Sequence, residues 1–182
     1  MSAPSTPVFG VTGWKNSGKT TLVIRLVETL TARGLRVSTV KHAHHAFDID
    51  HEGTDSYRHR QAGASEVALV SGRRWALMHE LREEAEPPLT EILARLAPCD
   101  LVLIEGYKRE GHPKIEARRR DARKHTPLCA EDRQVRAIAS DAPETVAEDL
   151  PVFALDDVEA IADFILAACG LETTGSGCHA AV

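Results

Sequence analysis

The chain has 182 residues, 43% of them hydrophobic, and it carries a formal net charge of -5 at pH 7, which together favour one domain with a substantial core. The acidic balance argues against general nucleic-acid binding, and no apolar run approaches the roughly 18 residues that a membrane-spanning helix needs. No secretory signal is visible at the N-terminus and the four cysteines are scattered, so we expect a cytoplasmic protein with reduced cysteines.

The first chemically informative segment along the chain is the sequence Gly-x-x-x-x-Gly-Lys-Thr at residues 13–20. An apolar run at residues 8–12 precedes it and a helical pattern at residues 21–32 follows, which is the context of a nucleotide phosphate loop. Backbone N–H groups of such a loop point at phosphate oxygens, and the helix N-terminus favours negative charge. We expect Lys19 to contact the β- and γ-phosphates and Thr20 to bind Mg²⁺. The residues predicted to hold the nucleotide here are Gly13, Lys15, Asn16, Ser17, Gly18, Lys19, Thr20 and Thr21.

Beyond the loop, apolar runs typical of strands alternate with amphipathic runs typical of helices. Further strands are expected at residues 36–41, 67–70, 75–78, 101–104, 135–139 and 152–155. Further helices are expected at residues 54–62, 88–96 and 157–168. This alternation predicts an α/β fold, a P-loop NTPase three-layer α/β/α sandwich with a mostly parallel, doubly wound sheet and a β-hairpin excursion. We expect one nucleotide-binding domain over residues 1–170 and a disordered tail over residues 171–182.

The apolar segment at residues 101–106 has the form of a Walker B element and ends in Glu105. In this architecture an acid at the end of a buried strand lies beside the phosphate loop. Glu105 is therefore expected to bind Mg²⁺ directly or through a water molecule, together with Thr20. The alternative is a solvated acid that merely ends the strand.

A polar loop at residues 42–51 contains four histidines and the acids Asp48 and Asp50. We expect a switch-like loop near the γ-phosphate, in which Asp48 or Asp50 orients water or Mg²⁺ ligands as part of the catalytic set with Lys19 and Glu105. Two alternatives remain open: a transition-metal site and a solvated polar loop. The spacing of the histidines is not a standard zinc pattern, and the adjacent His44 and His45 do not easily bind one ion together.

One residue late in the chain bears on which nucleotide base the site prefers. It is Asp141, which ends a late strand. The Asn-Lys-x-Asp motif of Ras-type proteins is impossible here because Asn16 is the chain's only asparagine. A carboxylate can accept hydrogen bonds from N1–H and the exocyclic amine of guanine, so Asp141 is the candidate for guanine selection. The alternative is that Asp141 caps a following helix.

A local excess of basic residues extends from Lys108 to Lys124. It is consistent with docking of an anionic ligand or acidic partner, or with an exposed, mobile loop of solvated charges. No glutamine follows the Walker B acid to orient an attacking water. No single arginine can be singled out as an arginine finger, the residue that stabilises the transition state of hydrolysis. Unassisted hydrolysis is therefore expected to be slow.

These segments together resemble the MobB family, the molybdopterin-guanine dinucleotide biosynthesis adaptor proteins. The likeness covers about residues 7–170 in the same order. It is carried most specifically by the phosphate loop combined with a Lys-His-x-His-His segment at residues 41–45. The other matching segments are residues 48–50, 55–57, 61–64, 74–78, 102–108 and 138–141.

The resemblance implies a homodimeric GTP-binding protein with weak GTPase activity, using GTP and Mg²⁺. Such proteins assist the guanylyltransferase that attaches GMP to molybdopterin, so this enzyme, other cofactor-biosynthesis proteins and molybdopterin itself are the expected partners. Lys19 and Thr20 receive the phosphate and Mg²⁺ roles and Glu105 the Walker B role. Related dimeric NTPases often have a lysine directly after the first loop glycine. Trp14 stands there instead, so position alone does not make Lys15 a lysine that reaches across the dimer.

Two other functions remain open at this point. One is a small-molecule kinase in which residues 118–120 bind the molecule that accepts the phosphate. The other is a carrier that holds the phosphate of molybdopterin on the same basic segment. A kinase transfers phosphate to an acceptor, whereas an adaptor GTPase slowly releases free phosphate.

Overall fold

The computed structural model describes residues 6–43, 48–124 and 126–171. These residues form two compact units, one comprising residues up to 42 and from 96 onward, the other comprising residues 43–95. His44, His45 and nearly all of the predicted tail lie outside the described residues. The single domain over residues 1–170 stays a prediction.

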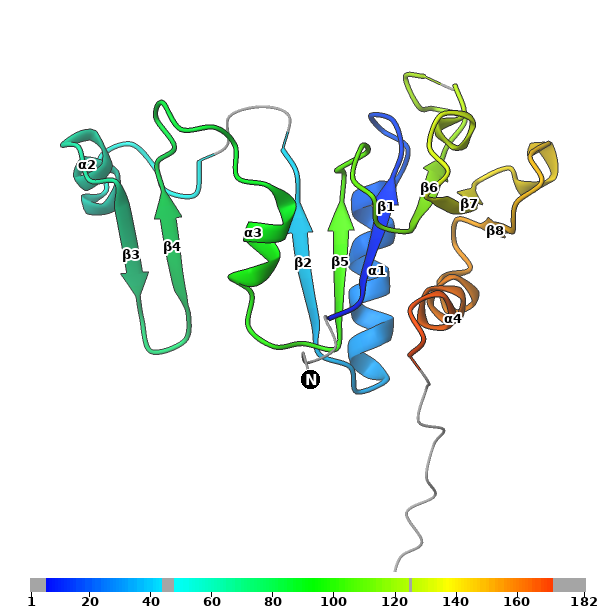
Figure 1. Cartoon of the computed structure of the whole chain (residues 1–182), viewed down its shortest axis with the longest axis horizontal. Coiled ribbons are helices and arrows are strands. Elements are labelled where there is room, and N and C mark those ends of the chain that lie inside the picture. Colours follow the sequence, from blue (N-terminus) through cyan, green and yellow to red (C-terminus); the bar gives the residue numbers. More distant parts are fainter. Residues whose placement is uncertain (1–5, 44–47, 125, 172–182) are drawn as a thin grey trace, which may run out of the picture. The chain divides into compact units, whose positions relative to one another are not determined.

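The first unit is built on a six-stranded sheet with the order β2-β5-β1-β6-β7-β8 (Figure 1). Every pair of neighbouring strands is parallel. The carboxyl ends of the strands therefore meet at one edge, where ligands gather in sheets of this kind. The strands are β1 Val8–Thr12, β2 Val37–Lys41, β5 Leu101–Glu105, β6 Lys114–Arg118, β7 Val135–Ser140 and β8 Val152–Ala154.

Two helices of this unit, α1 (Lys19–Ala32) and α4 (Val158–Ala168), pack against each other and share one hydrophobic core with the sheet. Leu22, Leu26 and Leu30 recur on one side of α1 and are buried there, as their spacing predicts. Short 3₁₀ turns, η1 (Leu128–Ala130) and η2 (Pro143–Thr145), lie in the loops that follow β6 and β7. The predicted α/β class with a mostly parallel sheet is confirmed.

Strand β6 is the main element that sequence reasoning missed, because its charged residues were interpreted as part of a basic loop. Lys114 and Glu116 are in fact buried in the centre of the sheet, with exposed fractions of 0% and 1%. The prediction of an exposed, mobile loop is therefore wrong for residues 114–118. The strand tolerates these charges because each one is paired inside the protein.

The second unit contains a helix α2 (Asp55–Gln61), a hairpin of β3 (Glu66–Val70) and β4 (Trp75–His79), and a helix α3 (Leu89–Ala94). The hairpin strands pair antiparallel, with Val70 opposite Trp75 beside the turn, which confirms the predicted excursion. The Thr54 hydroxyl accepts a hydrogen bond from the Tyr57 N–H and so caps α2. Within the described part of the chain, none of the helices has the length and apolar character needed to cross a membrane.

Candidate nucleotide site at the phosphate loop

The phosphate loop joins the end of β1 to the start of α1, and its backbone needs glycine at two places. Gly13 has φ 146°, and a Cβ there would lie 2.4 Å from the Ser17 hydroxyl and 2.5 Å from the carbonyl oxygen of Ala117. Gly18 has φ 91° and forms the N-cap of α1. The loop is thus folded tightly, with the N-terminus of α1 available for an anion. All predicted loop residues lie here: Gly13, Lys15, Asn16, Ser17, Gly18, Lys19, Thr20 and Thr21.

Lys19 begins α1 and folds back onto its own loop, where its ammonium group donates a 2.7 Å hydrogen bond to the carbonyl oxygen of Trp14. Burial, followed by the positive charge of Lys108, lowers the pKa of Lys19 below its ordinary value. The Ser17 hydroxyl is buried without a hydrogen-bond partner among the described residues. A buried hydroxyl and a partly desolvated ammonium group at a glycine loop suit a phosphate group.

The predicted metal side of the site is assembled by two neighbouring strands and α1. Glu105 lies beside Val11 in the register of β5 and β1, which brings its carboxylate to the phosphate loop. The Thr20 hydroxyl donates a 2.7 Å hydrogen bond to Oε1 of Glu105. Lys41 Nζ lies 3.3 Å from the same oxygen, and the Glu105 side chain is only 11% exposed. A hydroxyl next to a largely buried carboxylate fits a Mg²⁺ ion, which prefers oxygen ligands.

Next to the phosphate loop, a pocket of about 260 Å³ lies at the carboxyl ends of β6 and β7. Trp14 and Ser17 line it from the loop, and Asp141 lines it from the end of β7. Both carboxylate oxygens of Asp141 lie 3.2 Å from the backbone nitrogen of Arg120, which donates to them. Ala142 is the N-cap of η2 and no side chain caps it, so the alternative that Asp141 is a helix cap is wrong.

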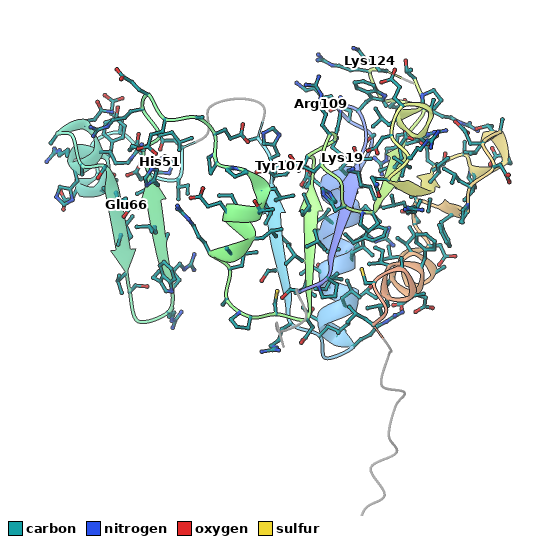
Figure 2. All side chains as sticks on the ribbon, in the orientation of Figure 1. Lys19, His51, Glu66, Tyr107, Arg109 and Lys124 are labelled. Atoms are coloured by element: carbon teal, nitrogen blue, oxygen red, sulfur yellow. The ribbon has the colours of Figure 1, made fainter. Side chains whose placement is uncertain are left out.

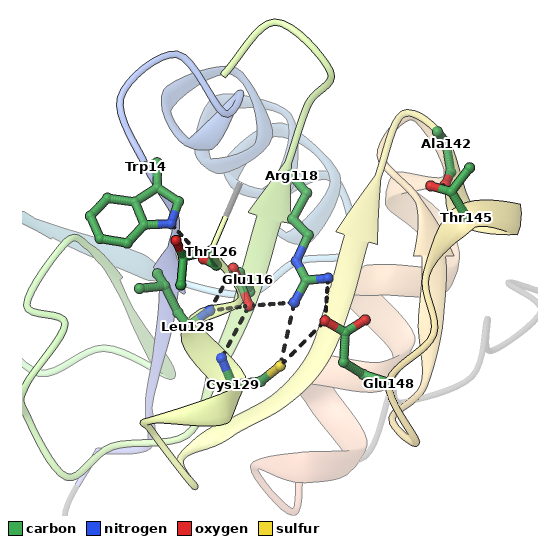
Figure 3. Close-up of polar contacts among 9 residues, drawn as sticks. All are labelled: Trp14, Glu116, Arg118, Thr126, Leu128, Cys129, Ala142, Thr145 and Glu148. Carbon is green, nitrogen blue, oxygen red and sulfur yellow. Dashed lines mark hydrogen bonds and ion pairs between the residues drawn. The ribbon is translucent and has the colours of Figure 1, made fainter. Parts of the chain in front are cut away.

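Glu116 and Arg118, which also line this pocket, belong to a largely buried ion network that sequence reasoning did not find (Figure 3). The Glu116 carboxylate accepts hydrogen bonds from the backbone nitrogens of Leu128 and Cys129 at 3.0 and 3.2 Å. Arg118 donates to Glu116 at 2.9 Å and to Glu148 at 2.7 Å. Burial disfavours the charged guanidinium, yet these two pairs hold the pKa of Arg118 above its ordinary value.

The basic segment at residues 108–124 therefore does not form one anion-binding surface. Lys114 is fully buried and forms a 2.9 Å ion pair with Asp132, while Arg118 is engaged by Glu116 and Glu148. Part of the segment does face the nucleotide site: Lys108 and Lys124 lie over the ring of Trp14, and Arg119 and Arg120 line the adjoining pocket. The alternation of charged and apolar residues in β6 was the available signal for a strand, since strand side chains alternate between faces.

In the second unit, Asp48 and Asp50 are both bound by Arg60, which sequence reasoning did not single out. Arg60 pairs with Asp48 at 2.7 Å, with Glu80 at 2.9 Å, and also with Asp50. The hydrogen bonds that Arg60 donates to Glu80 and Asp50 raise the pKa of Arg60 above its ordinary value. The catalytic role of Asp48 and Asp50 stays a prediction. Among the residues that the structure describes, no group of three or more His, Cys, Asp or Glu side chains is arranged to hold a metal.

Comparison with known proteins identifies relatives along most of the chain. Residues 8–141 match the family described as MobB, molybdopterin guanine dinucleotide synthesis protein B. An Escherichia coli protein named molybdopterin-guanine dinucleotide biosynthesis adapter protein is 40% identical over 162 residues, covering 88% of this chain and 91% of that protein. The Haemophilus influenzae protein of the same name is 41% identical over 162 residues, covering 87% of each.

The solved structures agree with the sequence relatives. A crystal structure of Bacillus subtilis MobB has a TM-score of 0.70 and 28% identity, covering 90% of this chain and 98% of that one. A crystal structure of molybdopterin-guanine biosynthesis protein B has a TM-score of 0.68 and 30% identity, covering 88% and 99% of the two chains. The chain therefore belongs to the molybdopterin guanine dinucleotide synthesis protein B family.

Proposed function

We propose that this chain is a GTP-binding adapter with weak GTPase activity that assists the guanylyltransferase attaching GMP to molybdopterin. Two relatives are named adapter proteins of molybdopterin-guanine dinucleotide biosynthesis, and these names support a role for this chain in that pathway. The observation that carries the nucleotide part is the Thr20–Glu105 hydrogen bond beside a glycine loop that contains Lys19. This hydrogen bond joins the phosphate loop to the Walker B strand, the two sequence elements that hold phosphate and Mg²⁺ in nucleotide-binding proteins of this type.

Each residue of the site has a distinct part in this proposal. The loop N–H groups and Lys19 bind the phosphates, and the Ser17 hydroxyl gains the partner that it lacks among the described residues. Thr20 and Glu105 hold Mg²⁺, which when bound neutralises phosphate charge. The Asp141 carboxylate, in the adjoining pocket, accepts hydrogen bonds from guanine N1–H and its amino group.

Weak hydrolysis follows from what stands next to Glu105. In Ras-type proteins a glutamine after this element orients the attacking water. Here the next residues are Gly106, Tyr107 and Lys108, none of which carries a carboxamide or carboxylate. The protein therefore holds GTP long enough to act through a partner enzyme.

The kinase and carrier alternatives depended on arginines 118–120 being available to an anion. Arg118 is engaged by Glu116 and Glu148, and Arg120 pairs with Glu144 at 3.1 Å. Arg119 lines the pocket beside the phosphate loop, so only Arg118 and Arg120 are occupied by the protein's own acids, which argues against a three-arginine acceptor site. The proposal includes a homodimer, which is supported by the exposed apolar pair Val70 and Trp75 on the hairpin, with exposed fractions of 80% and 70%. Light scattering tests the dimer, for which twice the mass of the chain is expected.

A reconstituted reaction tests the adapter role. Molybdopterin, Mg²⁺–GTP and the guanylyltransferase are incubated with and without this chain, and the dinucleotide product is quantified. We expect the wild-type chain to increase product formation and Lys19→Ala to lose the increase. Arg136→Ala, which removes an exposed charge in β7, serves as the matched control. Equal product with and without the wild-type chain would reject the adapter role.

A further inference from the structure

Trp14, within the phosphate loop, has two lysines over its ring. Lys108 Nζ lies 4.0 Å from the ring centroid and Lys124 Nζ lies 4.9 Å from it. Both distances fall within the range of favourable cation–π contacts. Two later segments of the chain thereby meet at the side chain of Trp14. Figure 2 shows Lys19 and Lys124 near the carboxyl ends of the strands.

Trp14 is itself held in place. Its indole nitrogen donates a 2.7 Å hydrogen bond to the carbonyl oxygen of Thr126 (Figure 3). The buried Glu116 carboxylate fixes the residues just beyond, because it accepts the backbone N–H groups of Leu128 and Cys129. The ring is therefore a rigid surface on which a lysine can be positioned.

The chain after β5 is shaped to deliver Lys108 to this ring. Gly106 and Tyr107 both have left-handed backbone conformations, with φ 96° and 45°. Such a conformation costs about 1 kcal/mol or more for a residue other than glycine. The turn begins directly at Glu105, so Lys108 is placed three residues from the acid that is proposed to hold Mg²⁺.

The lysines here exceed what the protein's own acids neutralise. Among the described residues Lys108 has no ion pair, and the charges that act on it are those of Lys19, Lys124 and Glu116, the last of which already binds Arg118. Burial, followed by the charge of Lys124, lowers the pKa of Lys108. Like charges held together cost free energy unless an anion joins them. A nucleoside triphosphate, bound at the adjoining glycine loop, brings that anion.

We propose that Lys108 is a second phosphate-binding lysine of the nucleotide site, positioned by Trp14, and that it contacts the terminal phosphate of GTP. This inference rests on the proposed function. It gives a role to the residue that stands where water-orienting residues follow the Walker B acid in other proteins. Lys108 stabilises the bound triphosphate and Trp14 acts through Lys108 as a positioning residue.

The test is a calorimetric titration of the full chain with GTP and with GDP in the presence of Mg²⁺. Loss of one charge-assisted contact to a phosphate lowers affinity by about 10- to 100-fold. We expect Lys108→Ala to weaken GTP binding by about that factor and GDP binding by less than threefold. Lys108→Arg should restore most of the affinity for GTP. Arg136→Ala, an exposed charge on β7, controls for the change in net charge.

The positioning role of Trp14 is measured in the same titration. Trp14→Phe keeps a ring face and should retain GTP affinity within about threefold, whereas Trp14→Leu should reproduce the Lys108→Ala loss. The double variant should then be no weaker than Lys108→Ala alone. Equal affinities of wild type and Lys108→Ala for GTP, or equal losses for GTP and GDP, would overturn the inference. Absence of nucleotide binding by the wild-type chain would instead reject the proposed function itself.

Discussion

The Thr20 hydroxyl donates a 2.7 Å hydrogen bond to the Glu105 carboxylate, joining the first turn of α1 to the end of β5. Because both oxygens suit Mg²⁺, we expect Glu105→Gln to weaken Mg²⁺–GTP binding by about tenfold. The affinity of that variant should change little when EDTA removes the metal, whereas wild-type affinity should fall. Titrations with and without Mg²⁺ measure both. Glu131→Gln, an exposed acid, is the control.

Asp141 is predicted to select guanine through its charge. Asp141→Asn keeps an oxygen that can accept the Arg120 N–H, so the loop should remain folded. We expect the preference for GTP over ATP to fall by about tenfold, because one of the two carboxylate oxygens becomes an NH2 group, which cannot accept a hydrogen bond from the N–H groups of guanine. Competition between the two nucleotides gives the ratio. An unchanged ratio would assign Asp141 to holding the Arg120 loop alone.

The buried Lys114–Asp132 pair is predicted to be a large contributor to stability. Lys114 is fully buried and Asp132 is its ion-pair partner at 2.9 Å. Asp132→Asn should lower the free energy of unfolding by about 3 kcal/mol, because it leaves a buried charge unpaired. Adding Lys114→Met should recover most of that loss, since the unpaired charge is then removed. Urea denaturation of both variants measures this, and a double variant as unstable as Asp132→Asn would contradict it.

His112 makes stability depend on pH. Its ring nitrogens are buried without hydrogen-bond partners among the described residues, and a Cβ at Gly10 would lie 2.6 Å from Nε2. Burial, followed by the charge of Lys114, lowers the pKa of His112 from 6.5 to about 4. The folded state therefore resists protonation that the unfolded state accepts. The resulting stability is complete above pH 6.5 and is lost as the pH falls towards 4.

Denaturation at several pH values checks this expectation. Wild type should lose about 2 kcal/mol between pH 7 and pH 4.5 beyond the loss seen in His112→Gln, which cannot titrate. The pKa of His79 is raised by hydrogen bonds to Glu66 and Glu84, and because wild type and His112→Gln both contain His79, its contribution cancels in the comparison. Parallel pH profiles of wild type and His112→Gln would contradict the prediction.

The sequence predicted the phosphate loop, the flanking elements and the place of Glu105, because these depend on local patterns. Strand, loop and helix follow one another within residues 8–32, and a fully apolar strand leads directly to the acid. Parallel pairing then places Glu105 beside Val11 whatever the rest of the chain does. This part of the site was therefore predictable.

The sequence did not predict β6, because its two basic residues, Lys114 and Arg118, are paired with acids that lie elsewhere along the chain. Lys114 pairs with Asp132, and Arg118 pairs with Glu148, which lies 30 residues away. Local reasoning treats lysine and arginine as solvent-exposed, since unpaired buried charges are costly. The same limitation hid the link from Glu116 to the loop that holds Trp14. Such networks become visible only in three dimensions.

Calorimetric titration of the wild-type chain with GTP and with ATP, in the presence of Mg²⁺, tests the central claim most directly. The account predicts one GTP site per chain, affinity for GTP at least about tenfold higher than for ATP, and loss of binding in Lys19→Ala. Failure to bind GTP, or equally tight binding of GTP by Lys19→Ala, would contradict it.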